Sequence, residues 1–120
     1  MEKKHSIIKS FTYAFQGIKT TLKREPNFKI QMLIGLLAII AGFVLNLSNI
    51  EWAILIVTIF MVLVFELINT TLETLVDLIS PNYSEGAKII KDVAAAAVLI
   101  SSILSIIVGL LIFLPKIVLE

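Results

Sequence analysis

Three long apolar stretches alternate with short polar segments along the chain. Residues 30–50 and 93–114 contain no charged side chain, and residues 52–72 contain only Glu66. Each stretch has the roughly 20 residues that a helix needs to cross a bilayer. The pattern predicts one membrane domain over residues 1–120 with three transmembrane helices, at about residues 28–48, 52–79 and 86–114.

The segment before these stretches, about residues 6–24, follows a different pattern. Its large apolar side chains recur at helical spacing within about 100° of one another on a helical wheel, while lysines and polar residues lie off this stripe. The stripe contains Ile7, Ile8, Phe11, Phe15, Ile18 and Leu22. We expect an amphipathic helix on the membrane surface. Pro26 suits the first turn of a new helix, so Glu25 should mark the joint between the two.

Composition and charge fix the class and the orientation. A hydrophobic content of 58% and a mean hydropathy of +1.01 exclude an ordinary soluble domain. The basic residues that precede the first span predict a cytoplasmic N-terminus: Lys3, Lys4, Lys9, Lys19, Lys23 and Arg24. We therefore expect an all-α, multi-pass membrane protein with a cytoplasmic N-terminus and no nucleic-acid partner. Its 46–51 loop should lie outside, its 80–92 loop inside, and Lys116 is the one exception to this charge bias.

Two local patterns suggest how the spans are placed. Trp52 opens the second span, where an amphipathic ring is expected to anchor the outer interface. Residues 94–97 are four alanines, and small residues let membrane helices approach closely. The third span should therefore pack there against another helix.

The middle span carries acidic residues where a membrane helix is normally apolar. Glu66, Asn69, Glu73 and Asp77 fall within an arc of about 80°, so they form one polar stripe, called the acid stripe below. A charged carboxylate within a bilayer costs roughly 2.5 kcal/mol or more, and such residues usually face a cavity, a bundle interior or an ion. The stripe therefore predicts a functional site that a cation neutralises.

Carboxylates near a lysine suit a divalent cation with phosphate. Mg²⁺ takes one or two protein carboxylates and fills its other positions with water and substrate phosphate oxygens. Lys91 and Asp92 begin the third span and Glu25 precedes the first, all on the predicted inner side. The chain contains none of the common nucleotide-binding loop motifs. The residues by themselves predict a metal and phosphate site at the inner face.

The spacing of these residues resembles a known signature. The string Glu66-x-x-Asn69-x-x-x-Glu73-x-x-x-Asp77, followed by Lys91-Asp92, resembles that of the small prokaryotic diacylglycerol kinases. The resemblance covers nearly the whole chain, including the basic surface helix and the three spans. The segment 109–116 and the start of the second span resemble the Gram-positive branch, whose members phosphorylate undecaprenol. The sequence departs from the diacylglycerol kinase pattern at Lys88 and at residues 89–90.

The resemblance implies a fold, cofactors and an assembly. It implies a homotrimer of three-helix subunits that uses ATP and Mg²⁺, with composite active sites at subunit boundaries near the cytoplasmic surface. Glu66 resembles the general base that accepts the lipid hydroxyl proton, and Asn69 would orient the base or the hydroxyl. Glu25 and Glu73 resemble the pair that coordinates the metal of the nucleotide.

The remaining implied roles concern the nucleotide. Lys91 resembles the lysine that bridges the phosphates, and Asp92 the acid that helps to hold the nucleotide. Tyr13 and the turn at Asn82, Tyr83 and Ser84 match stretches near the adenosine. Asp77 would be a supporting residue.

Several alternatives stay open at this stage. Diacylglycerol is the second candidate acceptor, since its hydroxyl is similar to that of undecaprenol. A small proton or cation conductor also uses carboxylates inside the membrane, but it needs polar groups along the whole path, and the outer halves of the spans are apolar. A structural or regulatory bundle without chemistry is the third alternative. His5, a lone histidine, is expected to lie in a mobile tail.

Overall fold

The computed structural model describes residues 6–119, which form helices and no strand. His5 lies outside the described residues, as do Lys3 and Lys4. The helices are α1 (Ile7–Arg24), α2 (Pro26–Val44), α3 (Asn49–Ile79) and α4 (Glu85–Val118). The expected all-α fold is confirmed, because α2, α3 and α4 are each long and apolar enough to cross a membrane.

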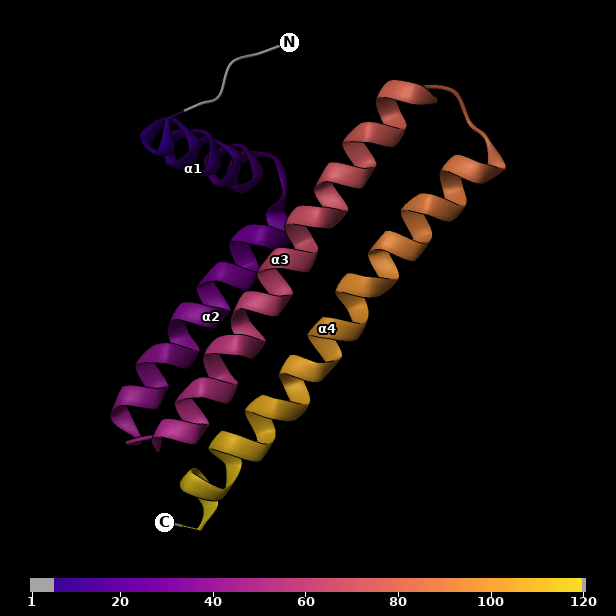
Figure 1. The fold of residues 1–120 in the computed structure, drawn as a ribbon. Coiled ribbons are helices and arrows are strands. Elements are labelled where there is room, and N and C mark those ends of the chain that lie inside the picture. The colour runs from indigo at the N-terminus through magenta and orange to yellow at the C-terminus, as the bar shows by residue number, and fades with distance from the viewer. Residues whose placement is uncertain (1–5, 120) are drawn as a thin grey trace.

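The three apolar helices run side by side, and α1 projects to one side of them from the start of α2 (Figure 1). The main packing is between α3 and α4, while α2 packs on α3 and α1 touches both α2 and α3. With 31 and 34 residues, α3 and α4 are about 46 and 51 Å long at 1.5 Å per residue. Both therefore exceed the roughly 30 Å of a hydrocarbon core, so their ends reach beyond it.

Helix α1 keeps its apolar stripe free of the bundle. Ser6 caps the helix, and its hydroxyl accepts a hydrogen bond from the Lys9 N–H at 3.2 Å. The large side chains at the start of the stripe are 61–79% exposed: Ile7, Ile8, Phe11 and Phe15. This exposed face is what an amphipathic helix offers to lipid.

Glu25 forms the joint between α1 and α2, as the sequence predicts. Its backbone is extended, with φ −116° and ψ 104°, because a residue before proline avoids helical angles. Its N–H donates to the Thr21 carbonyl at 2.8 Å, which closes α1. Thr21 and Phe28 are buried on either side of the joint. The direction of α1 relative to α2 is therefore set by packed residues.

The turn between α2 and α3 is sharp and internally bonded. Helix α2 ends at Val44, earlier than the expected span end at residue 48, because Asn46 adopts a left-handed φ of 57°. The Leu47 N–H donates to the Gly42 carbonyl at 3.2 Å, which completes a common helix-ending motif. Ser48 and Glu51 then cap α3 reciprocally, through bonds of 3.2 and 2.9 Å.

The far end of α4 returns to this turn. Helix α4 continues through Pro115 to Val118, beyond the expected span end at residue 114. Lys116 Nζ lies 3.1 Å from Glu51 Oε1. The lysine that is an exception to the charge bias therefore has an acidic partner, which joins the ends of α3 and α4.

Close contacts with glycine hold α2 against α3. A Cβ added at Gly42 would lie 2.7 Å from Trp52 Cη2, and one at Gly35 would lie 3.0 Å from Ile59 Cγ2. The Trp52 ring also packs on Phe43, with ring centroids 4.8 Å apart. Trp52, expected as an interface anchor, thus packs against the neighbouring helix.

The alanine segment of α4 contributes to packing at one position above all. Ala94 is buried, whereas Ala95 and Ala96 are exposed. Ala94 and Ala97 line a shallow hollow together with Phe65 of α3. Close packing of α4 against another helix is therefore confirmed at Ala94.

We predict that Gly42→Val destabilises the fold by about 1–3 kcal/mol, because the added methyl groups overlap Trp52 where little space exists. The free energy of unfolding, measured in mixed detergent micelles, tests this. Gly17→Val is the matched control, because a Cβ at Gly17 meets nothing within 4 Å. An equal effect of both substitutions would contradict the close contact.

Candidate active site

The acid stripe runs from a buried end to an exposed end along α3. Glu66 is 1% exposed and Asn69 is 8% exposed. Glu73 is partly buried, and Asp77 is exposed. The stripe therefore leads from the interior of the bundle to its aqueous end.

The buried end of the stripe is bonded to α2. Gln31 Nε2 donates a hydrogen bond of 3.0 Å to Glu66 Oε1. The sequence analysis missed Gln31, because an uncharged amide near the start of an apolar helix carries no motif. Its only signal was polarity at a position where the neighbouring residues are apolar.

The joint before α2 lies near the middle of the acid stripe. Glu25 and Glu66 are both close enough to Glu73 for their charges to act on it. Like charges at short range repel one another, and a shared cation removes that repulsion. Among residues 6–119 no cluster of three or more acidic or histidine side chains is suited to a metal. The pair of Glu25 and Glu73 matches the one or two carboxylates that Mg²⁺ takes from a protein.

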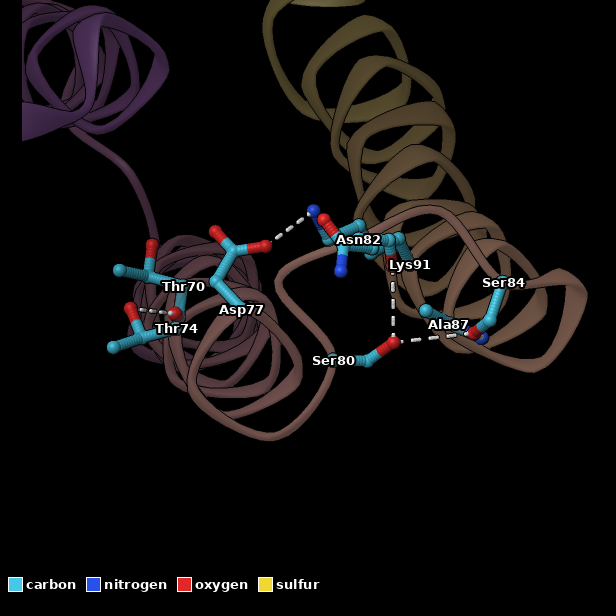
Figure 2. A network of polar contacts seen from close by, with 8 residues as sticks. All are labelled: Thr70, Thr74, Asp77, Ser80, Asn82, Ser84, Ala87 and Lys91. Atoms are coloured by element: carbon cyan, nitrogen blue, oxygen red, sulfur yellow. Dashed lines mark hydrogen bonds and ion pairs between the residues drawn. The ribbon is translucent and has the colours of Figure 1, made fainter.

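Lys91 of α4 lies beside the exposed end of the stripe. Its Nζ is 2.7 Å from Asp77 Oδ1, as Figure 2 shows, and its charge also acts on Glu73. The pair joins α3 to α4 across the turn. Side-chain exposures of 41% and 65% leave the lysine accessible from water.

Asp92 is paired with a residue at which the sequence departs from the diacylglycerol kinase pattern. Lys88 Nζ lies 2.6 Å from Asp92 Oδ2, one helical turn along α4. Both side chains are largely exposed, so the pair contributes little to stability. The structure thus brings Lys91 to the stripe and gives Asp92 a partner on its own helix.

The turn between α3 and α4 has its own hydrogen bonds (Figure 2). The Ser80 hydroxyl donates to the Asn82 carbonyl at 3.1 Å and contacts the Ser84 hydroxyl at 3.3 Å. Ser84 caps α4 by accepting from the Ala87 N–H at 3.0 Å. Tyr83 is 81% exposed. Hydrogen bonds therefore hold the base of the turn, while the Tyr83 side chain is exposed.

Tyr13 lies on α1, away from this turn. Its side chain is half-exposed. In Figure 1, α1 lies beside the start of α2, whereas the turn joins the end of α3 to the start of α4. Within one chain, the helix that carries Tyr13 therefore lies apart from the turn that carries Asn82, Tyr83 and Ser84.

Three buried polar atoms at and near the buried end of the stripe have no hydrogen-bond partner within the described part of the chain. They are Gln31 Oε1, Asn69 Oδ1 and Thr70 Oγ1. Buried polar atoms are usually paired, and an unpaired one away from water costs free energy. Such atoms are expected where another molecule completes the site.

A groove of about 510 Å³ leads away from Gln31 between α2 and α4, with α3 as its floor. Its walls are mostly apolar, from Ile34 and Ala38 to Ile106 and Phe113. Gln31 lines one end of the groove and also donates a hydrogen bond to Glu66. One end of the apolar groove therefore lies next to the buried carboxylate.

Comparison with known proteins decides the family. The model of the family described as prokaryotic diacylglycerol kinase matches residues 12–113. The chain belongs to this family. It is therefore a lipid kinase, and its family uses ATP as the phosphoryl donor.

Relatives in the family are named after different lipid acceptors. The chain is 44% identical over 108 residues to an undecaprenol kinase of Bacillus subtilis. The matched region covers 90% of this chain and 88% of the relative. It is 40% identical to a diacylglycerol kinase of Synechocystis, covering 92% of this chain and 63% of the relative. A diacylglycerol kinase of Escherichia coli is 32% identical, over 84% of this chain and 83% of the relative. These identities support the resemblance to the Gram-positive branch.

The hydroxyl groups deeper in this kinase do not extend the acid stripe. Thr58, Ser101 and Ser105 each donate to a carbonyl of their own helix, at 2.7, 2.9 and 2.7 Å. Their protons are used within the helix, so these three hydroxyls do not continue the acid stripe beyond Glu66. The acid stripe therefore lies towards one end of the bundle, the end at which α3 meets α4.

Proposed function

We propose that the protein transfers the γ-phosphoryl group of ATP to undecaprenol and produces undecaprenyl phosphate for the assembly of envelope carbohydrates. The observation that carries this proposal is the buried carboxylate of Glu66 at the end of an apolar groove, in a chain that is 44% identical to an undecaprenol kinase. Diacylglycerol is the alternative acceptor, because other relatives carry that name.

Glu66 acts as the general base in this proposal. The O–H bond of the lipid alcohol breaks, and its proton passes to a carboxylate oxygen of Glu66. The alcohol oxygen bonds to the γ-phosphorus, and the bond from that phosphorus to the bridging oxygen breaks, so ADP leaves with the electron pair. Phosphoryl transfer depends mainly on positioning and neutralisation of charge, and positioned bases contribute about 10²–10⁴-fold.

The nucleotide is held by groups that neutralise charge. Glu25 and Glu73 would hold Mg²⁺, which would neutralise the phosphates of ATP. Lys91 meets the phosphates, and Asp92 helps to hold the nucleotide. Asn69 lies one turn from Glu66, and its unpaired carbonyl is available to orient the reacting groups.

The apolar groove suits the hydrocarbon chain of the acceptor. A polyprenyl alcohol carries one hydroxyl on a long apolar chain, so its head must reach Glu66 while its chain stays in an apolar environment. The groove between α2 and α4 provides this combination, since Gln31 lies at one end and Ile34, Ala38 and Phe113 lie along it.

The protein assembles as a homotrimer in the cytoplasmic membrane, with its N-terminus and active sites on the cytoplasmic side. Lysines before the first span favour this orientation. Within one chain, helix α1, which carries Tyr13, lies apart from the turn at Asn82, Tyr83 and Ser84 (Figure 1). These adenosine contacts then come from two subunits, so the site is shared at a subunit boundary.

We expect Glu66→Gln to lower kcat by about 10²–10⁴-fold, because the amide cannot accept the hydroxyl proton. Turnover of radiolabelled ATP in lipid micelles measures this, and size-exclusion chromatography with light scattering checks that the assembly is unchanged. Glu51→Gln is the control, since Glu51 pairs with Lys116 at the opposite end. Turnover at the parental rate would exclude Glu66 as the base.

Glu73→Gln should raise the Mg²⁺ concentration for half-maximal rate by at least about tenfold, because one of two carboxylate ligands is lost. A titration of rate against free Mg²⁺ at saturating ATP gives this value. Glu85→Gln, which removes an exposed acid in the first turn of α4, should leave the titration unchanged. A metal dependence identical to that of the parent would remove Glu73 from the coordination shell.

The choice of acceptor is tested directly with both lipids. We expect a higher kcat/KM for undecaprenol than for diacylglycerol when each is presented in the same detergent and phospholipid mixture. Product is quantified as labelled lipid phosphate. Equal values, or a preference for diacylglycerol, would contradict undecaprenol as the acceptor while leaving the lipid kinase assignment in place.

A further inference from the structure

One side-chain hydrogen bond connects the proposed base to another helix. Gln31 on α2 and Glu66 on α3 are 35 residues apart, and the Gln31 Nε2 donor lies 3.0 Å from Glu66 Oε1. Glu66 is 1% exposed, so water does not compete for this oxygen. The bond therefore has a large effect on the orientation of the carboxylate.

The chemistry of the donor matters as much as its position. A carboxylate has two oxygens, and a donor on Oε1 leaves the other oxygen to receive a proton. A lysine or arginine at this position would hold the carboxylate in a charged pair, whereas the amide of Gln31 is neutral. A neutral amide orients the carboxylate and keeps it reactive.

The neighbouring amide is arranged differently. Asn69 lies one helical turn from Glu66, and its Oδ1 is buried without a partner. Gln31 Oε1 is also buried without a partner, and Gln31 lines the apolar groove. Both acceptor atoms are available to a donor that another molecule brings. The carboxylate itself is held by Gln31.

We propose that Gln31 is a positioning residue of the phosphoryl transfer, and this inference rests on the function proposed above. Its amide occupies one oxygen of Glu66 and fixes the carboxylate, so that the second oxygen takes the hydroxyl proton of the lipid. Gln31 does not itself exchange a proton. Its effect falls on the chemical step and leaves nucleotide binding unchanged, because Glu25, Glu73 and Lys91 hold the nucleotide.

Two substitutions at Gln31 test this in the full-length protein. Gln31→Met keeps the length of the side chain and removes the donor. Gln31→Glu keeps the shape and replaces the donor with a carboxyl group. Each should lower kcat for undecaprenol by about 10- to 100-fold, the size of effect that a misplaced reacting group produces. The KM for MgATP should stay within about twofold, because the substitutions do not reach the groups that bind the nucleotide.

Ser101→Ala is the matched control for a structural effect. Ser101 is buried and does not line the groove, and its hydroxyl donates to its own helix, to the Val98 carbonyl at 2.9 Å. This variant should keep the parental kcat. All rates are expressed per folded protein, as quantified by size-exclusion chromatography, and Gln31→Glu carries the test alone if Gln31→Met does not fold.

The outcomes separate this inference from the proposed function. Lower kcat at unchanged KM for MgATP, with a parental kcat for Ser101→Ala, supports the positioning role. A kcat within about twofold of the parent for either Gln31 variant overturns it, as does an equal loss in Ser101→Ala. If Gln31→Met is active while Glu66→Gln is inactive, only the positioning role fails. If Glu66→Gln is active, the general base itself is wrong.

Discussion

The structure depends on burying one carboxylate inside an apolar bundle. Glu66 is almost fully enclosed, and a charge in such surroundings is unfavourable unless polar groups stabilise it. The surrounding features follow from this constraint. An amide from α2 donates a hydrogen bond to the carboxylate, the rest of the acid stripe extends from it to the aqueous end of α3, and a lysine from α4 lies at the exposed end. The helices thus place one acidic group between the apolar groove and the exposed end of the stripe.

Long helices and a sharp joint produce this placement. Because α3 extends past the start of α2, its second half passes α1 and the joint at Glu25 before it reaches the turn to α4 (Figure 1). The carboxylates of the joint and of the stripe then approach each other without any loop insertion. Close glycine contacts between α2 and α3 set the depth at which Gln31 meets Glu66. Packing in the apolar part therefore determines the geometry of the polar part.

Much of this was predictable from the sequence, and the reasons are physical. The length of the apolar stretches predicted the three long apolar helices, and helical periodicity predicted that the acidic residues share one face. The restriction that proline places on its neighbour predicted the joint at Glu25. Gln31 was not predictable, because its bond depends on the register of two helices 35 residues apart. The partner of Lys91 and the contact of Trp52 with Gly42 depend on register in the same way. The end of α2 was placed too late, because the left-handed Asn46 has no strong sequence signal.

The ion pair between Asp77 and Lys91 has a consequence for the proposed phosphate contact. Under the proposed function, a phosphate that approaches Lys91 meets a lysine already paired with Asp77. Because both side chains are exposed, the pair is weak and the lysine can exchange one negative partner for another. Asp77 would then balance the charge of Lys91 whenever no nucleotide is bound.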